Sequence, residues 1–262
     1  MEVPLHLHEQ TREQSRATAA ESLLLWPLGA VEQHGPHLAV GTDWLTVADL
    51  AEAAGRTARE RVPITIAPPM PFGSSHHHLP FGGTMSLSTD TYYRAVRDLA
   101  ESLVAAGYRR IFLLNGHGGN HELLQLVARD VALAHPVRIA AGSYWVIAWD
   151  ALVAQGAHLP GRLPGHAGAF ETSLMLARHP GLVQATRPHR ADAAGGDPRG
   201  WQPSYRSECH GSWQAIDGYS DSPDRGSAET GRRWFDTVVA CLVEALVTFH
   251  GEPLPDGPPA GR

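Results

Sequence analysis

The stretch Leu23–Leu28, of sequence LLLWPL, is apolar along its whole length and runs directly into Gly29. A short run that is apolar on both faces is typical of a strand in a parallel sheet covered on both sides. Residues 111–114 (IFLL) form a second such run and lead into a glycine-rich segment. Residues 64–67 (ITIA) and 137–141 (VRIAA) are two further predicted strands. Together these runs predict a mainly parallel sheet.

Segments with helical character alternate with these strands. The predicted helices cover residues 43–61, 90–106, 121–134, 167–177 and 228–249. Thr42 or Asp43 is expected to cap the first helix, and Gly107 to end the second. This alternation predicts an α/β fold, a three-layer α/β/α sandwich with a mainly parallel central sheet. Residues 191–227, rich in Gly, Pro, Ser and Asp, receive no predicted regular structure.

Length and charge limit the classes of protein. The 262 residues fit a single domain, predicted over 1–250, with a flexible Pro- and Gly-rich tail over 251–262. The net charge of -6 gives no basic face for nucleic acid. No apolar run approaches the roughly 20 residues of a membrane span, and the polar N-terminus does not resemble a signal peptide. Cys209 and Cys241 are far apart, which suits a reducing cytosol, and a cytoplasmic location is predicted.

Four potential metal ligands follow two of the predicted strands. Glu32 and His34 are two residues apart after the first strand, so that in an extended segment they share one face. Asp43 begins the next helix, and His117 follows the strand over 111–114. Ligands gather at the carboxyl ends of strands in open α/β sheets. This set of oxygen and nitrogen donors without a thiolate predicts a site for Zn²⁺, Mn²⁺ or Fe²⁺.

A second cluster lies at the start of the predicted helix over 167–177. His166 belongs to the entering loop, where it could orient substrate or shuttle a proton, and Glu171 lies inside the helix as a metal ligand, a general base or a simple N-terminal carboxylate. The balance of charges favours Glu171 as a metal ligand. Two divalent cations carry four positive charges, which Glu32, Asp43, Glu171 and one hydroxide would neutralise. His37 is expected to have a structural or supporting role.

The loop over residues 72–88 contains three consecutive histidines. Its flanking Gly and Pro residues indicate a shaped loop, and at least His78 is expected to line the active site. Other hydrolase and nucleotide-binding classes are disfavoured, because the chain has neither a Gly-x-Ser-x-Gly elbow nor a Gly-x-x-x-x-Gly-Lys-Ser/Thr loop. His117 and His121 have the spacing of a zincin helix, but the glycines between them disfavour a helix there.

Five segments, in order, resemble the creatininase (creatinine amidohydrolase) family. They are residues 29–38 (GAVEQHGPHL), 41–43 (GTD), 72–84 (FGSSHHHLPFGGT), 115–120 (NGHGGN) and 165–173 (GHAGAFETS). The resemblance covers about residues 20 to 190. It implies a two-metal centre, often Zn²⁺ with Mn²⁺ or Fe²⁺, and assembly as a homohexamer.

The resemblance also implies roles for individual residues. Asp43 would bridge the two metals, Glu32 and His117 would bind one of them, and His34 would bind the other. His166 and Glu171 are the expected catalytic residues, and Glu171 is also a predicted ligand. A second set, Ser75, His78 and Asn120, is expected to contact the substrate.

The expected reaction is hydrolysis of an amide or lactam C–N bond in a small molecule by water that the metals activate, with His166 stabilising the oxyanion or passing a proton to the leaving nitrogen. Creatininase itself carries a metal-binding glutamate two residues after the histidine that matches His117, where this chain has Gly119. This departure argues against creatinine as substrate and favours Glu171 as the ligand that completes the second metal site.

Three alternatives stay open. A peptidase that trims the mycofactocin precursor would need a groove for a peptide tail. A deformylase of a pyrimidine nucleotide would need a phosphate site, for which Arg56, Arg59 and Arg61 are the basic residues to consider. A metal-binding protein without catalysis is the third.

Overall fold

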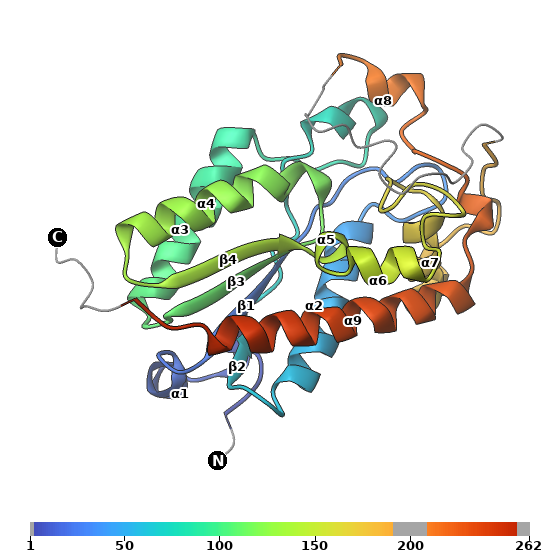
Figure 1. Cartoon of the computed structure of the whole chain (residues 1–262). Coiled ribbons are helices and arrows are strands. Elements are labelled where there is room, and N and C mark those ends of the chain that lie inside the picture. Colours follow the sequence, from blue (N-terminus) through green and yellow to red (C-terminus); the bar gives the residue numbers. More distant parts are fainter. Residues whose placement is uncertain (1–2, 191–208, 256–262) are drawn as a thin grey trace.

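The computed structural model describes residues 3–190 and 209–255, and it is built around a four-stranded parallel sheet (Figure 1). The strands are β1 (Leu23–Leu28), β2 (Ile64–Ile66), β3 (Arg110–Asn115) and β4 (Arg138–Ser143), in the order β2-β1-β3-β4. Each neighbouring pair is parallel. The structure thus confirms the four predicted strands, with ends that differ by at most two residues.

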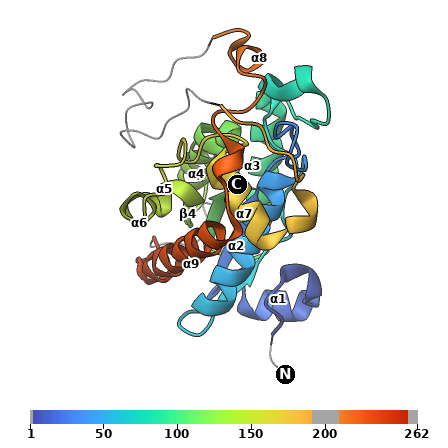
Figure 2. The same cartoon turned by 90° about the vertical axis from the view of Figure 1, so that its right-hand side faces the viewer.

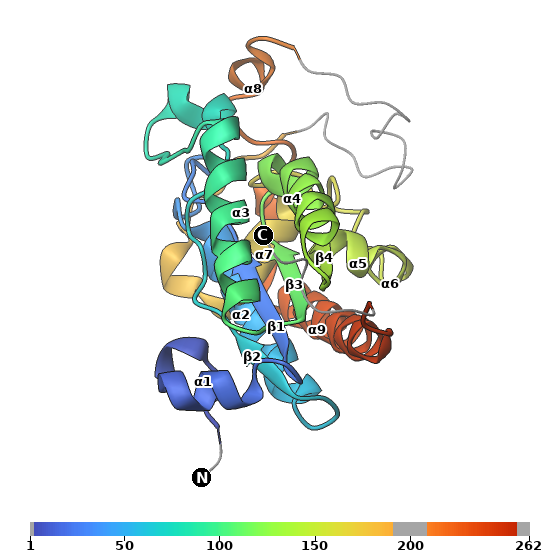
Figure 3. The same ribbon diagram turned by 90° about the vertical axis from the view of Figure 1, so that its left-hand side faces the viewer.

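Alternate residues of β1 face opposite sides of the sheet. Leu24 and Trp26 pack in one hydrophobic cluster with α3 (Thr89–Ala105) and α4 (His121–Ala134). Leu23 and Leu25 pack in a second cluster with α2 (Thr42–Ala58) and α9 (Ala228–Gly251). Figures 1 and 3 show these helices on the two faces of the sheet. The three-layer α/β fold with a parallel sheet is therefore confirmed.

Helix α9 is apolar enough to require a separate explanation. It has 24 residues and a stretch of mean hydropathy 1.3, so by length and composition alone it could cross a membrane, contrary to the expectation that no apolar run approaches such a span. Its residues Trp234, Val238, Leu242 and Leu246 are buried in the core, where α9 packs against α2 and α7 (Ala169–Arg178). A helix with this packing is a core helix of the sandwich.

Several short elements were not predicted. They are α1 (Arg12–Thr18), α5 (Tyr144–Ile147), α6 (Trp149–Ala154), α8 (Ser212–Ala215), and the 3₁₀ turns η1 (Leu7–Glu9), η2 (His76–Phe81), η3 (Gly118–Asn120), η4 (Pro180–Leu182) and η5 (Pro223–Arg225). The segment 191–227, left without regular structure, thus contains α8 and η5; its residues 191–208 lie outside the described part. The predicted cap of α2 is wrong by one residue, because Gly41 is the N-cap and the Thr42 hydroxyl donates to the carbonyl of Ala39.

The predicted flexible tail is attached over its described part. Helix α9 continues to Gly251, and Arg138 donates to the Glu252 carboxylate at 2.6 Å and to the carbonyl of Pro253 at 2.8 Å. These bonds connect residues 252 and 253 to β4, and the flexibility predicted for residues 251–262 stays a prediction. Residues 256–262 lie outside the described part.

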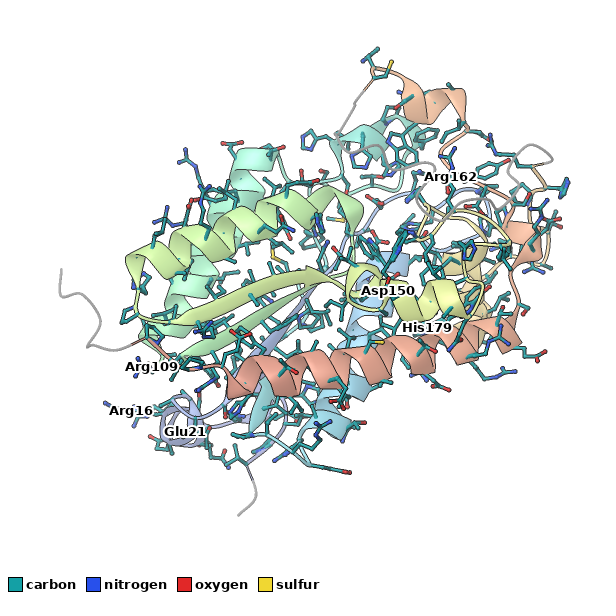
Figure 4. All side chains as sticks on the ribbon, in the orientation of Figure 1. Arg16, Glu21, Arg109, Asp150, Arg162 and His179 are labelled. Atoms are coloured by element: carbon teal, nitrogen blue, oxygen red, sulfur yellow. The ribbon has the colours of Figure 1, made fainter. Side chains whose placement is uncertain are left out.

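The topology brings the predicted ligands to one end of the sheet. From β1 the chain moves to β2 on one side, while β3 lies on the other side, so β1 and β3 flank a topological switch point where ligands usually bind. Leu28 pairs with Asn115, so both strands end at the same level. Helix α8 lies at this end of the molecule, opposite α1 (Figures 1 and 2). Figure 4 likewise places Arg162 far from Arg16 and Glu21.

Candidate metal centre

The four predicted ligands meet at the carboxyl ends of β1 and β3. Glu32, His34, Asp43 and His117 are all buried, none with more than 4% of its surface exposed. Nε2 of His34 lies 3.0 Å from Oδ1 of Asp43, and Nδ1 of His117 lies 3.0 Å from Oδ2 of the same carboxylate. Asp43 therefore stands between the two imidazoles, one carboxylate oxygen toward each.

Glu32 is surrounded by imidazoles. Its Oε1 lies 3.3 Å from Nδ1 of His117, 3.4 Å from Nδ1 of His166 and 3.5 Å from Nε2 of His78. Burial alone would raise the pKa of Glu32, but the neighbouring imidazoles, above all that of His117, hold it well below its ordinary value. The centre thus combines an ionised carboxylate with several nitrogen donors.

The second ring nitrogens of His34 and His117 are occupied by backbone acceptors. Nδ1 of His34 lies 3.1 Å from the carbonyl of Glu32, and Nε2 of His117 lies 3.2 Å from the carbonyl of Ser74. A carbonyl oxygen only accepts, so each of these nitrogens must carry the proton. In its neutral form, each imidazole then turns a lone pair toward a carboxylate oxygen of Asp43. Such an arrangement needs a positive ion between the two groups, either a proton or a metal.

Within the described part of the chain, several buried carboxylate oxygens have no hydrogen bond, and they too require a positive ion nearby. Among the described residues, both oxygens of Glu32 and Oδ2 of Asp43 have no hydrogen-bond partner. A buried ionised group without a partner is costly, unless a cation binds it. The ligand atoms of two trios, His34, Asp43 and Glu171, and Glu32, His77 and His117, lie within 4.8 Å of one another in each trio. The residues present therefore fit two adjacent divalent cations.

His166 and Glu171 lie beside this centre as predicted, one before α7 and the other in its first turn. Nε2 of His166 lies 2.9 Å from the carbonyl of Gln33, which places the ring proton there and turns the free Nδ1 toward Glu32. Burial and the neighbouring His34 hold the pKa of His166 well below its ordinary value. His166 is therefore neutral near pH 7 and can accept a proton at Nδ1.

Glu171 lies on the side of the centre next to His34. Its Oε2 is 3.8 Å from Nε2 of His34 and accepts a hydrogen bond from the backbone of Ala167. Burial raises the pKa of Glu171 to about 8, although the charge of His34 opposes the change. Burial would lower the pKa of His34, but the carboxylates of Asp43, Glu171 and Glu32 outweigh it and raise that pKa to about 10. The protein groups alone thus retain protons that a metal would displace.

The three predicted substrate contacts have different surroundings. His78 is buried, with Nε2 facing Glu32, and its Nδ1 lies 2.9 Å from the Gln33 side chain. Oγ of Ser75 lies 3.1 Å from Nε2 of His117, so Ser75 supports a ligand. The Asn120 amide accepts from the backbone of Ser74 and donates to the carbonyl of Gly29. Asn120 is 0% exposed, and these bonds connect neighbouring loops; its predicted contact with the substrate stays a prediction.

The supporting role expected for His37 agrees with its position. Nε2 of His37 lies 2.9 Å from the hydroxyl of Thr172, which connects the loop after β1 to α7. Burial and the charge of His34 lower the pKa of His37 to about 4, so the ring is neutral near pH 7. His37 therefore joins two segments that carry ligands.

Sequence reasoning missed two residues at the mouth of the centre. His77 is exposed, and its ring stacks parallel to that of His117 with a centroid distance of 6.0 Å. Trp213 of α8 lies over three imidazoles, with centroid distances of 4.7 Å to His78, 5.2 Å to His166 and 5.8 Å to His77. A tandem histidine run gave a signal for His77, whereas a lone Trp in an irregular segment gave none. Trp213 forms an aromatic wall above the ligands.

Gly119 lies too close to its neighbours to carry a side chain. A Cβ atom there would be 2.2 Å from the carbonyl oxygen of Ser74 and 2.5 Å from Nε2 of His117. Any side chain at this position would therefore displace both the loop and the ring of His117. The packing of this chain thus requires glycine at position 119.

Comparison with known proteins places the chain among amide hydrolases whose activity agrees with a metal centre. The family model described as Creatininase: Creatinine amidohydrolase matches residues 8–246. The chain is 33% identical to the creatinine amidohydrolase of Pseudomonas putida over 190 residues, which is 66% of this chain and 71% of that protein. It is 32% identical to the mycofactocin precursor peptide peptidase of Mycobacterium tuberculosis (strain CDC 1551 / Oshkosh) over 251 residues, 93% of this chain and 91% of that one.

Solved structures of creatininases have the same fold as this chain. The structure of a manganese creatininase has a TM-score of 0.79 and 26% sequence identity, and the match covers 95% of this chain and 99% of that one. A Zn-Zn type creatininase variant matches with a TM-score of 0.78 over 96% of this chain and 100% of the other, also at 26% identity. From the family match, the curated relatives and the arrangement of Glu32, His34, Asp43 and His117, the chain belongs to the creatininase family.

Proposed function

We propose that this protein hydrolyses the C–N bond of a small cyclic or substituted amide, with water activated by a pair of divalent cations. Membership of the creatininase family supports an amidohydrolase acting on C–N bonds other than peptide bonds. Zinc is the proposed metal, with manganese or iron as alternatives. Solved structures of creatininase include a manganese form and a Zn-Zn type variant.

One observation carries this proposal. The backbone carbonyls of Glu32 and Ser74 fix the ring protons of His34 and His117, so that both imidazoles offer lone pairs to Asp43 at 3.0 Å. This is how protein ligands of a metal are oriented, because the second nitrogen of a ligating histidine is usually held by a carbonyl or carboxylate.

The residues divide into two sets around Asp43. Glu32 and His117 would hold one cation, His34 and Glu171 the other, and Asp43 would bind both. When bound, such a pair lowers the pKa of water and polarises a carbonyl oxygen. The oxygen-rich set with two imidazoles suits zinc, manganese or iron.

His166 is the proposed proton carrier. It is neutral near pH 7, and its free Nδ1 faces the centre 3.4 Å from Glu32. Nδ1 can accept a proton from the attacking water and return it to the leaving nitrogen. His78 faces the same carboxylate through Nε2. Because the Gln33 amide nitrogen lies 2.9 Å from Nδ1 and can donate to it, the ring proton belongs on Nε2, where it can donate to the substrate.

A peptidase of the mycofactocin type is the second candidate, and a specific observation favours it. The match to the Mycobacterium tuberculosis peptidase covers 93% of this chain, against 66% for the creatinine amidohydrolase. The resemblance places a glutamate at position 119 in creatininase, so Gly119 argues against creatinine as the substrate. For this function the exposed side of Trp213 and His77 would receive a peptide end.

A nucleotide deformylase has less support. Arg56 pairs with Glu52, and Arg61 pairs with Glu244, which leaves neither free for phosphate. Arg56 also lies thirteen residues after Asp43 along α2, which is about 20 Å at 1.5 Å per residue. Arg56 is therefore remote from the centre.

The test is a substrate panel on protein reconstituted with zinc, manganese or iron. Creatinine and other cyclic amides form one arm, and peptides ending in the sequence of a mycofactocin precursor form the other. Turnover in the first arm supports the proposal, and turnover only in the second supports the peptidase. Bound metal without turnover in either arm would contradict both and would leave a metal-binding protein without catalysis.

Self-association and cellular location stay proposals. The match to the creatininase family is what supports assembly of several copies of the chain. We propose a homohexamer in the cytoplasm. Light scattering of the purified protein would measure the subunit number, and a monomeric mass would contradict the assembly.

A further inference from the structure

The segment over residues 218–222 crosses the loop that carries His166. The backbone N–H of His166 donates to Oγ of Ser220 at 2.8 Å, and the backbone N–H of Ser220 donates to the carbonyl of His166 at 2.9 Å. Both backbone groups of His166 are thus bound by one residue. Gly218, two residues earlier, accepts a hydrogen bond from the Gln33 side chain at 2.7 Å. This short segment therefore contacts both His166 and the Gln33 side chain.

The next residue, Asp221, holds the start of α7. Its Oδ1 accepts from the backbone of Ala169 at 2.8 Å, and its Oδ2 accepts from the backbone of Arg162 at 3.1 Å. The Ser220 hydroxyl donates to Oδ2 at 2.9 Å. Ala169 begins α7, whose own N-cap, Gly168, has no side chain to serve as a cap. Asp221, 0% exposed, therefore caps this helix from another segment.

Glycines surround this carboxylate. A Cβ atom at Gly161 would lie 2.2 Å from Oδ1 of Asp221, and one at Gly168 would lie 2.1 Å from Oδ2. Gly168 has a φ of -93°, which any residue can adopt, so the space beside Asp221 is the reason that glycine is needed. The backbone before α7 is wrapped tightly around one side chain.

A strained residue lies between these bonds. Ala167 has a φ of 50°, in the left-handed region that residues other than glycine rarely adopt, and it is completely buried. Its N–H donates to the carboxylate of Glu171. Backbone strain of this kind persists only where the surroundings fix it. Here His166 is held by Ser220 on one side of Ala167, and Ala169 is held by Asp221 on the other.

We propose that Ser220 and Asp221 are positioning residues, which set the places of His166 Nδ1 and the Glu171 carboxylate relative to Glu32 and His34. This inference rests on the proposed hydrolysis, since it assigns roles to the residues that support His166 and Glu171. Neither Ser220 nor Asp221 is proposed to touch the substrate. Their effect on the reaction passes through the loop that they hold.

The first test compares Asp221→Ala and Asp221→Asn with Thr11→Ala. Thr11 caps α1 at the opposite end of the molecule, so the control loses a helix cap without contacting the centre. With saturating metal, Asp221→Ala should lower kcat about 100-fold and change KM by less than about threefold, as expected for a small misplacement of reacting groups. Asp221→Asn should lose less, because its one amide oxygen can still accept from Ala169. Thr11→Ala should keep the wild-type kcat.

The result that overturns the inference is a folded Asp221→Ala protein with wild-type kcat, since the side chain would then serve stability alone. If Asp221→Ala does not fold, Asp221→Asn decides in the same way, and a wild-type kcat in that variant rejects the positioning role. Absence of metal and turnover in the wild-type protein would instead reject the proposed hydrolysis. The two failures are thus distinguishable.

A double-mutant cycle tests the packing without any assay of activity. Gly168→Ala should lower Tm strongly in the wild-type background, because the new Cβ meets the Asp221 carboxylate. In the Asp221→Ala background the same substitution should lower Tm by less than half as much, since contacting residues show coupling in such cycles. Equal losses in the two backgrounds would show that Asp221 does not shape this loop and would overturn the inference.

Discussion

Nδ1 of His117 lies 3.0 Å from Oδ2 of Asp43, although Asp43 stands in the first turn of α2 and His117 follows β3, 74 positions later in the chain. The other nitrogen of His117 is held by the carbonyl of Ser74, so the contact with Asp43 joins a lone pair to an anion unless a cation lies between them. This relationship explains why the protein groups alone retain protons, and it leads to the first prediction.

Removing the metal should make stability depend on pH above neutrality. In the metal-free protein the pKa of His34 is raised from 6.5 to about 10, so its contribution is fully present below pH 6.5 and is lost as pH rises toward 10. Glu171, raised from 4.5 to about 8, acts in the same direction, with its contribution present below pH 4.5 and lost as pH rises through 8. Thermal unfolding of chelated protein should show Tm falling between about pH 7 and pH 10, and falling less after metal is restored. Equal slopes for the two forms would contradict this account.

Gly119→Ala and Gly118→Ala form a matched pair. The added methyl group at 119 meets the carbonyl of Ser74 and the ring of His117, whereas a Cβ at 118 has nothing within 4 Å. Gly119→Ala should cost about 1–3 kcal/mol of stability, the usual range for overpacking, and should lower metal content. Gly118→Ala should leave both close to wild type. Denaturant titration and elemental analysis measure the two effects, and similar behaviour of the two variants would show that space at 119 is not limiting.

Trp213→Ala should affect substrate binding more than catalysis. The indole lies over His77, His78 and His166, and it is not among the proposed ligands. Loss of an aromatic contact worth about 0.5–1.5 kcal/mol should raise KM roughly two- to tenfold, with a smaller change in kcat. Gln214→Ala, an exposed change in the same helix, is the control. A wild-type KM for Trp213→Ala would remove this residue from the substrate site.

The packing of α9 can be tested with two leucines. Leu246 is 0% exposed in the core, and Leu133 at the end of α4 is 80% exposed. Leu246→Ala should cost about 2–5 kcal/mol, and Leu133→Ala should stay within about 0.5 kcal/mol of wild type. Urea titrations of the purified proteins measure both. Little effect of Leu246→Ala would contradict the assignment of α9 to the core.

The strands, and the place where the four proposed ligands meet, could be predicted because each depends on local pattern. The run Leu23–Leu28 is apolar on both faces, which only a covered parallel strand requires, and the ligands follow such runs directly. Once β1 and β3 are adjacent and parallel, Glu32 and His117 must meet at one edge.

The remaining features depend on contacts that no local pattern encodes. Asp221 is one acidic residue in an irregular segment, and its role appears only when Arg162 and Ala169 are seen to donate to it. Asn120 stands in a glycine-rich motif beside a ligand, yet its amide is used by the backbone of neighbouring loops. The short helices α5 and α6 have too few turns to show a helical period.

The most direct test of the central claim is elemental analysis of the purified wild-type protein and of Asp43→Ala. The account predicts two divalent cations per wild-type chain, and loss of both in the variant, because Asp43 is proposed to hold both. It also predicts that hydrolysis disappears with them. A wild-type chain without bound divalent cations that still hydrolyses its substrate, or an Asp43→Ala protein with full metal content, would contradict the account.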